Sequence, residues 1–406
     1  MRIAVIGAGA AGMMAAGRAA ELSGDVTLFE KNKFSGKKLR ITGKGRCNVC
    51  NDCDVNTVIE NIPTNPRFMY AALSNFEPSD TKDFFESLGV KLKTERGNRV
   101  FPVSDKAEDI VNALREYTKR NGVRYINEEV KKISFDGERF AVNAASLYEF
   151  DRVIIATGGA SYPLTGSTGD GYRFAKEFGI EVTDLHPSLV PLEMFDRECA
   201  QMQGLSLKNT ALEVIDTSNN KCVYSDFGEM MFTHYGVTGP MILSASSHLG
   251  RFERGRYKIQ LDLKPALDEK TLDARILSDF AKFANRDFAN SLSELLPQKM
   301  IPVIINRSGI LPTKKVNAIT KEERHALLSV LKKFELTVKQ PRPLSEAIIT
   351  SGGVSVKEIS PKTMESKKIS GLFFCGEVID VDAYTGGFNL QVAFSTARLA
   401  AENAIY

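Results

Sequence analysis

The sequence is poor in the residues that mark several common protein classes. It has no tryptophan, four histidines and six cysteines in 406 residues. Cysteines this sparse exclude a disulfide scaffold and suit a reducing compartment. No stretch reaches the roughly 18 uninterrupted apolar residues that span a bilayer, so we expect no membrane partner. Basic and acidic residues nearly cancel, 53 against 50, which gives no general case for nucleic acid as a partner.

What remains is an ordinary globular composition, with 43% hydrophobic and 25% charged residues. A chain of this length exceeds the size at which one core keeps growing, so two or three structural units are expected. The apolar run after Arg2 could be mistaken for a secretory signal, but its three glycines fit a dinucleotide-binding loop better. We therefore expect a cytoplasmic protein whose partner is a small-molecule substrate.

Three of the cysteines are evenly spaced. Cys47, Cys50 and Cys53 follow the C-x2-C-x2-C pattern found in parts of iron–sulfur and zinc sites. A fourth ligand is missing, and no histidine stands near the trio. We therefore expect no metal site and interpret the trio as free thiols in a polar loop.

The N-terminus carries the strongest motif. A β-branched apolar run, Arg2 to Ile6, precedes a G-x-G-x-x-G loop and the helix-prone stretch Met13 to Leu22. The first glycine permits a tight turn, the second lets backbone approach a pyrophosphate, and the third lets helix pack close to strand. The phosphates would then meet the positive end of the helix. The residues that we expect at the pyrophosphate are Gly7, Gly9, Ala10, Ala11 and Gly12.

A second apolar run, Val26 to Phe29, ends in Glu30, 18 residues beyond Gly12. A carboxylate at this position accepts hydrogen bonds from the ribose hydroxyls of an adenosine and would repel a 2′-phosphate. FAD or NAD is therefore favoured over NADP. The sequence has no second G-x-G-x-x-G unit, so we do not expect a nicotinamide cofactor to be resident beside the first.

The segment that follows, Lys31 to Asn48, is basic and punctuated by glycines. Part of it is expected to wrap the pyrophosphate and the flavin. Two other interpretations of this segment stay open, a plain solvated loop and a nucleic-acid-binding segment. The lack of aromatic residues beyond Phe34 argues against the second. The basic residues are Lys31, Lys33, Lys37, Lys38, Arg40, Lys44 and Arg46.

These strings resemble a known family. Ser35 to Leu39 and Gly43 to Asn48 are similar to the bacterial NAD(P)/FAD-dependent oxidoreductases of the aminoacetone-oxidase and BaiN type. The likeness runs from end to end of the chain, with one departure at Cys50, where relatives usually carry Thr. The other agreeing segments are Arg99 to Pro102, Ala156 to Gly159, Thr168 to Gly171, Thr233 to Pro240 and Gly371 to Gln391.

The resemblance implies an α/β fold with a discontinuous, Rossmann-like FAD-binding domain, an inserted β-rich domain and a helical sub-insertion. We place the FAD-binding domain at residues 1–190 and 345–406, the β-rich domain at 191–266 and 335–344, and the helical insertion at 267–334. Local patterns agree, because residues 256–264 alternate as a half-exposed strand does, and residues 271–283 have helical apolar spacing.

Two C-terminal segments are expected at the same cofactor. Gly371 to Glu377 is typical of a strand that delivers an acid, and Thr385 to Gln391 precedes an alanine-rich helix that runs to about Asn403. In the family's fold this helix starts beneath the flavin N1 and C2 carbonyl. The remaining residues predicted to bind non-covalent FAD are Glu30, Lys31, Lys38, Leu39, Thr42, Gly43, Arg46, Cys47, Asn48, Val130, Thr157, Gly158, Gly159, Gly376, Glu377, Gly387, Phe388, Asn389 and Leu390.

The flavin supplies the redox chemistry, so a catalytic base is not obligatory. His234 is a candidate proton donor or substrate contact, because it alone of the histidines lies in a family-matching segment, and Arg99 and Tyr162 are further candidates. We expect hydride transfer at flavin N5 to a small organic substrate, with NAD(P)H as a transient reductant. An oxygen-using amine oxidase and a flavin-bearing RNA-binding or scaffold protein stay open as alternatives.

Overall fold

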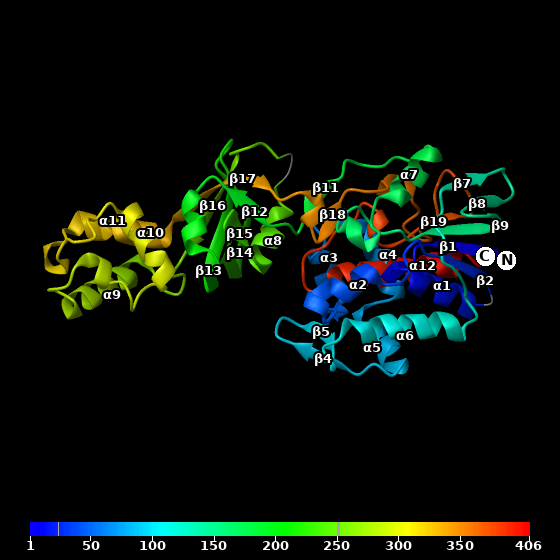
Figure 1. Cartoon of the computed structure of the whole chain (residues 1–406), viewed down its shortest axis with the longest axis horizontal. Coiled ribbons are helices and arrows are strands. Elements are labelled where there is room, and N and C mark those ends of the chain that lie inside the picture. The colour runs from blue at the N-terminus through cyan, green and yellow to red at the C-terminus, as the bar shows by residue number, and fades with distance from the viewer. Residues whose placement is uncertain (23, 250–251) are drawn as a thin grey trace. The chain divides into compact units, whose positions relative to one another are not determined.

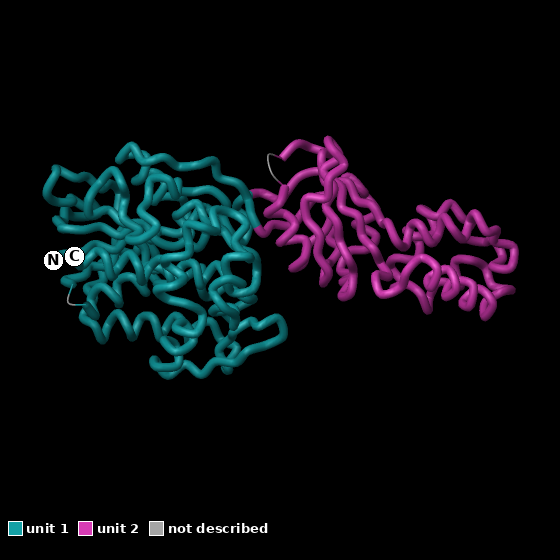
Figure 2. The backbone as a smooth tube through the Cα atoms, turned by 180° about the vertical axis from the view of Figure 1, so that it is seen from behind, with its two compact units in different colours: residues 1–188, 344–406 teal, residues 189–343 magenta. Residues whose placement is uncertain are grey.

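The computed structural model describes residues 1–22, 24–249 and 252–406. The chain forms two compact units, residues 1–188 with 344–406 and residues 189–343 (Figure 2). Two short antiparallel strands, β11 (His186–Ser188) and β18 (Ile349–Ser351), stand where the chain leaves the first unit and returns to it. The first unit is therefore discontinuous in sequence.

The first unit is built on a five-stranded parallel sheet with the order β19-β10-β1-β2-β6. Every residue of β1, β2 and β10 after the first, and every residue of β19, is buried, which suits a parallel sheet covered on both faces. Helices α1, α6 and α12 pack together along one side, and β9 contacts β1 from the other (Figure 1). The strands are β1 (Arg2–Ile6), β2 (Asp25–Phe29), β6 (Arg124–Ile126), β10 (Arg152–Ile155) and β19 (Leu372–Phe374).

Two smaller sheets complete this unit. One contains β3 (Cys50–Asn51), β5 (Arg99–Pro102) and β4 (Leu92–Glu95), and the other contains β7 (Lys132–Phe135), β8 (Phe140–Asn143) and β9 (Leu147–Phe150). The helices are α1 (Ala10–Glu21), α2 (Lys37–Ile41), α3 (Val55–Glu60), α4 (Tyr70–Asn75), α5 (Pro78–Ser87), α6 (Ala107–Arg120), α7 (Asp170–Glu177) and α12 (Phe388–Asn403).

The second unit is a closed six-stranded barrel with helices inserted between its strands, three of them between β16 and β17. The barrel and the helices share one continuous apolar core, to which Phe232, Leu336 and Leu327 belong. The barrel strands are β12 (Leu192–Met194), β13 (Ser206–Asp216), β14 (Lys221–Phe232), β15 (Gly236–Thr238), β16 (Tyr257–Asp262) and β17 (Phe334–Pro341). The helices are α8 (Pro240–Ser246), α9 (Glu269–Lys282), α10 (Ile301–Ser308) and α11 (Lys321–Lys332).

The predicted fold class is confirmed: a discontinuous α/β domain with a parallel Rossmann-like sheet carries a β-barrel insertion with helices. The finer domain limits given above stay a prediction. A search of the described parts of the chain finds no helix with the length and apolarity needed to cross a membrane.

Candidate functional site

A pocket opens at the carboxyl ends of four strands of the parallel sheet. Its walls include Ile6 at the end of β1, Glu30 after β2, Thr157 after β10 and Cys375 after β19. The pocket holds about 1370 Å³ of empty space, counting the part open to solvent. Ligands of doubly wound α/β folds bind in this crevice, where the strand order reverses on either side of β1.

The three glycines of the G-x-G-x-x-G motif, of which Gly12 lies inside α1, have two different roles. Gly7 has φ +101° and Gly12 packs so tightly that a Cβ there would stand 1.7 Å from the Gly7 carbonyl oxygen. A Cβ on Gly9 would meet nothing within 4 Å. Gly7 and Gly12 thus let helix and strand approach, while Gly9 leaves open space in front of the helix N-terminus. That space, beside the positive end of the helix dipole, fits a pyrophosphate.

Glu30 is held in place by backbone donors. Its Oε2 accepts from Ala8 N at 2.8 Å, and its Oε1 accepts from Asn32 N and Asn32 Nδ2, each at 2.8 Å. A carboxylate has about four acceptor sites, so capacity remains for ribose hydroxyls on the pocket side. Glu30 and Asn32 both line the pocket. Asn32 is not among the residues predicted from the sequence, although it stands only two residues from Glu30.

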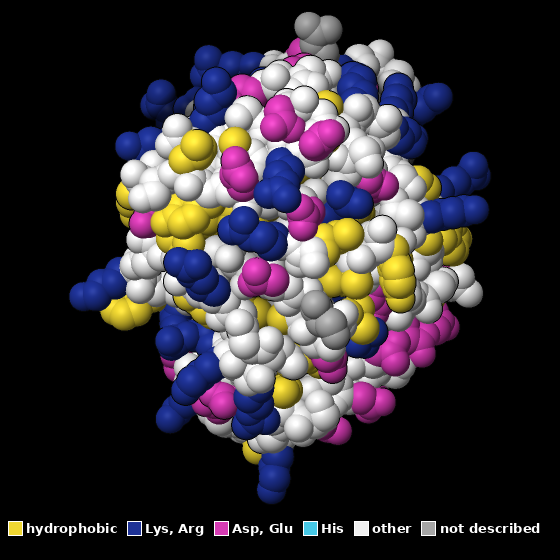
Figure 3. Space-filling view, turned by 90° about the vertical axis from the view of Figure 1, so that its right-hand side faces the viewer, with side chains coloured by type: hydrophobic (Ala, Val, Ile, Leu, Met, Phe, Trp, Pro, Cys, Tyr) yellow, Lys and Arg dark blue, Asp and Glu magenta, His cyan; other side chains and the backbone are white. Residues whose placement is uncertain are grey.

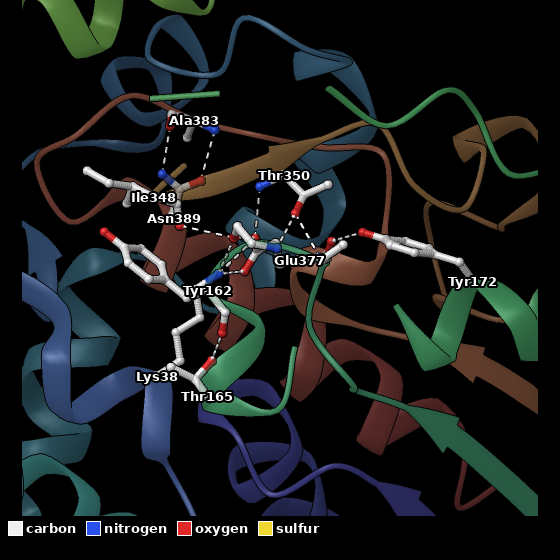
Figure 4. Close-up of polar contacts among 11 residues, drawn as sticks. Lys38, Tyr162, Thr165, Tyr172, Ile348, Thr350, Glu377, Ala383 and Asn389 are labelled. Carbon is white, nitrogen blue, oxygen red and sulfur yellow. Dashed lines mark hydrogen bonds and ion pairs between the residues drawn. The ribbon is translucent and has the colours of Figure 1, made fainter. Parts of the chain in front are cut away.

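A polar cluster joins the two halves of the first unit at the pocket wall (Figure 4). Lys38 Nζ donates to Glu377 Oε2 at 2.8 Å and to Ser161 Oγ at 2.7 Å. Glu377 Oε1 accepts from Thr350 N at 3.0 Å. Lys38 and Glu377 both line the pocket, and their side chains are only 22% and 15% exposed. The cluster fixes one ammonium group at the wall.

The start of α12 also borders the pocket. Asn389 Oδ1 accepts from Ala383 N at 2.9 Å, and its Nδ2 donates to the Ala383 carbonyl at 2.6 Å, which closes the preceding loop. A Cβ on Gly387 would stand 2.3 Å from the carbonyl carbon of Cys50. Gly387 is therefore needed for packing, and a bulky residue there would test the fold rather than the flavin.

The cysteines of the trio are free thiols, as interpreted, but Cys47 and Cys50 do not stand in a polar environment. Cys47 and Cys50 are fully buried, because β3 lies between β5 and the start of α12. Burial raises the pKa of both thiols to about 12, and that of Cys53 to about 11. In the described residues no group of three or more His, Cys, Asp or Glu side chains is arranged to hold a metal ion.

These pKa values predict a thiol-reactivity pattern. At about pH 8 the thiolate fraction of Cys47 and Cys50 is negligible, whereas Cys222 is exposed. With Ellman's reagent the native protein should show one fast thiol, and Cys222→Ser should remove it. Fast reaction of two or more thiols in folded Cys222→Ser protein would contradict the buried environment.

The three catalytic candidates lie in different places. Tyr162 adopts a left-handed backbone conformation, with φ +51°, and its carbonyl accepts from Thr165 N and Oγ1. Arg99 is exposed on β5, with its guanidinium 5.9 Å from the Phe101 ring. His234 lies in the second unit, between β14 and β15. Their catalytic roles stay predictions.

Of the predicted cofactor residues, fifteen line the pocket and nine do not. Those that line it are Gly7, Gly9, Ala10, Ala11, Glu30, Lys31, Lys38, Leu39, Thr42, Val130, Thr157, Gly158, Glu377, Asn389 and Leu390. The described wall does not include Gly12, Gly43, Arg46, Cys47, Asn48, Gly159, Gly376, Gly387 or Phe388. Arg46 instead pairs with Glu95 and Asp105.

Several wall residues carried no usable signal. Ile348 and Ile349 enter from β18 and the residue before it, and no local pattern marks them as ligand contacts. Thr165 to Ser167 could have been predicted from the sequence, because Gly166, Gly169 and Gly171 mark a glycine-rich turn. In the structure Gly166 has φ +101°. Residues with a local sequence pattern could therefore be predicted, whereas residues that only the tertiary fold brings to the pocket could not.

The geometry of the pocket itself fits FAD. Gly9 leaves room at a helix N-terminus, Glu30 has spare acceptor capacity, and a second helix begins at the far wall. Thr157 Oγ1 is buried at this wall without a hydrogen-bond partner in the described part of the chain. A bound dinucleotide with polar ring edges would supply such a partner.

Known proteins resemble the chain over nearly its full length. It is 31% identical over 405 residues to the ribosomal RNA dihydrouridine synthase of Haemophilus influenzae, covering 98% of this chain and 96% of that protein. It is 30% identical over 409 residues to the 3-dehydro-bile acid delta(4,6)-reductase of Clostridium scindens, covering 99% and 98%.

A solved structure supports the fold. The 3-ketosteroid delta1-dehydrogenase from Sterolibacterium denitrificans aligns with a TM-score of 0.52 at 12% identity, covering 99% of both chains. The model of the HI0933-like protein Rossmann domain matches residues 1–403. With that match and the dinucleotide site described above, the chain belongs to the HI0933-like family and is an FAD-dependent oxidoreductase.

Proposed function

We propose that the protein is a reductase that delivers hydride to a carbon–carbon double bond conjugated with a carbonyl group. The observation that carries this proposal is the chemistry shared by its relatives. The name of one describes reduction of ring double bonds in a 3-keto bile acid, and dihydrouridine is uridine whose ring double bond is reduced. In both substrates a carbonyl group activates the bond toward hydride.

NAD(P)H is proposed to deliver electrons transiently. The described residues contain a single G-x-G-x-x-G turn at a parallel sheet, so a nicotinamide cofactor has no second site of this kind. The bound flavin supplies the two-electron chemistry. Glu30 and the α1 N-terminus would hold the adenosine and pyrophosphate end of FAD, and the α12 N-terminus would stand toward the ring end.

Lys38 places a fixed positive charge at the pocket wall. Glu377 and Ser161 orient its ammonium group, so no reorganisation is needed when negative charge develops nearby. Hydride addition to the β carbon leaves an enolate, which must take a proton at the α carbon. Tyr162 is the proposed proton donor, since its unusual backbone conformation is the kind found at functional sites.

The charge on Lys38 gives a measurable prediction. Lys38→Met should lower the midpoint potential of the bound flavin by about 30 mV or more, because reduced flavin loses about 1.4 kcal/mol of stabilisation. Lys33→Met is the matched control, since Lys33 lies outside the pocket wall, beside Phe34. Equal potentials in both variants, measured with FAD bound, would place Lys38 away from the ring.

Anaerobic stopped-flow absorption tests the function itself. NADH or NADPH should bleach the flavin, and a steroid with a 4-en-3-one group should then restore its visible bands, with the saturated ketone as product. Bleaching by aminoacetone, followed by fast reoxidation with oxygen, would instead favour the amine oxidase. Failure of every conjugated ketone and of uridine to restore the bands would contradict the reductase.

A second candidate within this chemistry is reduction of uracil in RNA. The relatives named as ribosomal RNA dihydrouridine synthases favour it, so the expectation that no nucleic acid binds stays only a prediction. The structural observation beside it is a set of exposed cations, Lys44 on the loop after α2 and Arg96 and Arg99 on the β4–β5 hairpin.

A further inference from the structure

Thr350 is a buried residue of β18 that contacts two segments of the first unit at once. It is 1% exposed. Its Oγ1 accepts hydrogen bonds from Ala160 N at 2.9 Å and from Ser161 N at 3.1 Å. Its own N donates to Glu377 Oε1 at 3.0 Å. Thr350 therefore holds both the loop after β10 and the acid after β19.

The hydroxyl group can approach this loop because residue 159 is glycine. A Cβ on Gly159 would stand 2.5 Å from Thr350 Oγ1 and 2.8 Å from Glu377 Oε1. A side chain at this position would push the hydroxyl away from Ala160 N and Ser161 N, or displace the carboxylate. The sequence thus leaves room for the Thr350 hydroxyl and the Glu377 carboxylate together.

Ser161 and Glu377 are the two residues that orient the Lys38 ammonium group. Lys38 Nζ donates to Ser161 Oγ at 2.7 Å, and to Glu377 Oε1 and Oε2 at 3.0 Å and 2.8 Å. Ser161 Oγ in turn donates to Glu377 Oε1 at 3.1 Å. Figure 4 shows Glu377 between Thr350 and Lys38. Thr350 thus contacts Lys38 only through these two partners.

The Lys38–Glu377 pair differs from the many charges on the protein surface. On the face seen in Figure 3, basic and acidic side chains are interspersed and open to solvent. Such charges are screened by water and salt. The side chains of Lys38 and Glu377 are only 22% and 15% exposed, and both line the pocket. The effect of this pair on a bound ligand therefore depends on how its two ends are oriented.

We propose that Thr350 is a positioning residue for the Lys38 ammonium group. This inference rests on the proposed function, in which Lys38 supplies a fixed positive charge at the pocket wall. The Thr350 hydroxyl fixes the backbone of Ser161, and the Thr350 N–H fixes the carboxylate of Glu377. A charge held in this way stabilises negative charge on a ligand without reorganisation.

The strand that carries Thr350 is itself held from outside the pocket wall. Thr350 stands opposite Pro187 in the ribbon of β11 and β18. Asp382, which is 1% exposed, accepts from Ser188 Oγ at 2.8 Å and from Ser351 Oγ at 3.1 Å. One buried carboxylate thus binds both strands of the ribbon. The position of Thr350 is fixed independently of Lys38.

The test compares the midpoint potentials of bound FAD, which are measured against a reference dye and need no substrate. Thr350→Val removes the hydroxyl but keeps the N–H that binds Glu377. The ratio of reduced to oxidised FAD affinity should fall at least about threefold, which a two-electron couple reports as a drop of about 14 mV. Thr350→Ala should give the same drop, because it removes the same hydroxyl without a methyl group against the two N–H donors. Thr350→Ser should restore the ratio to within about 1.5-fold of the wild type.

Thr183→Val is the matched control. Thr183 Oγ1 accepts from Gly353 N at 3.0 Å, just after β18, and Thr183 is not part of the described pocket wall. Its replacement removes a hydroxyl that binds the same segment but not the cluster around Lys38. The affinity ratio should stay within about 1.5-fold of the wild type. Equal drops in Thr183→Val and Thr350→Val would overturn the proposal, because general loosening of the segment would then be the cause.

The double variant Lys38→Met with Thr350→Val tests whether Thr350 acts through Lys38. Once the ammonium group is gone, Thr350→Val should change the ratio by less than about 1.5-fold. Additive drops in the double variant would overturn the proposal, as would an unchanged potential in Thr350→Val. Loss of FAD from folded Thr350→Val and Thr350→Ala alike would also overturn it, since Thr350 would then hold the cofactor site as a whole.

The outcome is separable from that of the proposed function. The expected potentials, in a protein that no conjugated ketone or uridine reoxidises, would sustain the role of Thr350 and refute the reductase. Reduction of the 4-en-3-one steroid by the wild type, with an unchanged potential in Thr350→Val, would overturn the role of Thr350 and leave the reductase standing.

Discussion

Gly12→Ala should destabilise the first unit and abolish FAD binding. The added Cβ would stand 1.7 Å from the oxygen and 2.9 Å from the carbon of the Gly7 carbonyl. Both atoms belong to backbone, so α1 would have to move away from β1, and overpacking of this kind costs about 3 kcal/mol. Thermal unfolding and the flavin content of the purified variant measure the two effects.

Gly9→Ala is the matched control, because its Cβ would meet nothing within 4 Å and its backbone is not left-handed. The apoprotein should unfold as the wild type does. The new methyl group would nonetheless enter the space assigned to the pyrophosphate, so the Kd for FAD should rise by about tenfold or more. Normal FAD affinity in Gly9→Ala would show that the phosphates lie elsewhere, and normal folding of Gly12→Ala would refute the packing argument.

Glu30→Ala should weaken FAD binding by about 1–3 kcal/mol, which corresponds to roughly 5- to 150-fold in Kd. Two ribose hydroxyls would lose a charged acceptor, and Ala8 N and Asn32 N would lose theirs. Equilibrium titration of the apoprotein with FAD measures the change. Turnover at saturating FAD should persist.

Glu129→Ala provides the comparison for Glu30, because Glu129 is an exposed acid that also lines the pocket. Glu129→Ala removes the same charge as Glu30→Ala but leaves the hydrogen-bonded carboxylate of Glu30 in place. The Kd for FAD should therefore change less than about twofold. Unchanged affinity in Glu30→Ala, together with collapsed turnover, would mean that the ribose assignment is wrong.

The nucleotide end of the site could be predicted because its residues are consecutive. Strand, glycine turn, helix and Glu30 fall within the first thirty residues, and each has a local physical signature. The other end depends on the fold. Lys38 and Glu377 are 339 residues apart, and Thr350 joins them from β18. No local periodicity links such positions.

For the cysteine trio, the local sequence pattern predicted the wrong surroundings. The spacing of the cysteines and their neighbours predicted a polar loop, yet Cys50 is buried and stands in a strand of two residues, too short to be recognised from alternation. Its burial comes from a distant element, since the backbone of Cys50 is where Gly387 approaches. A contact between positions so far apart could not be read from the neighbours of Cys50.

The pocket at the strand ends of the first unit is expected to hold FAD. The most direct measurement denatures the purified, folded protein and identifies the released flavin by chromatography and mass. The account predicts about one FAD per chain for the wild type and greatly reduced FAD for Gly12→Ala. Recovery of FMN, or of no flavin from protein that is folded and was supplied with FAD, would contradict it.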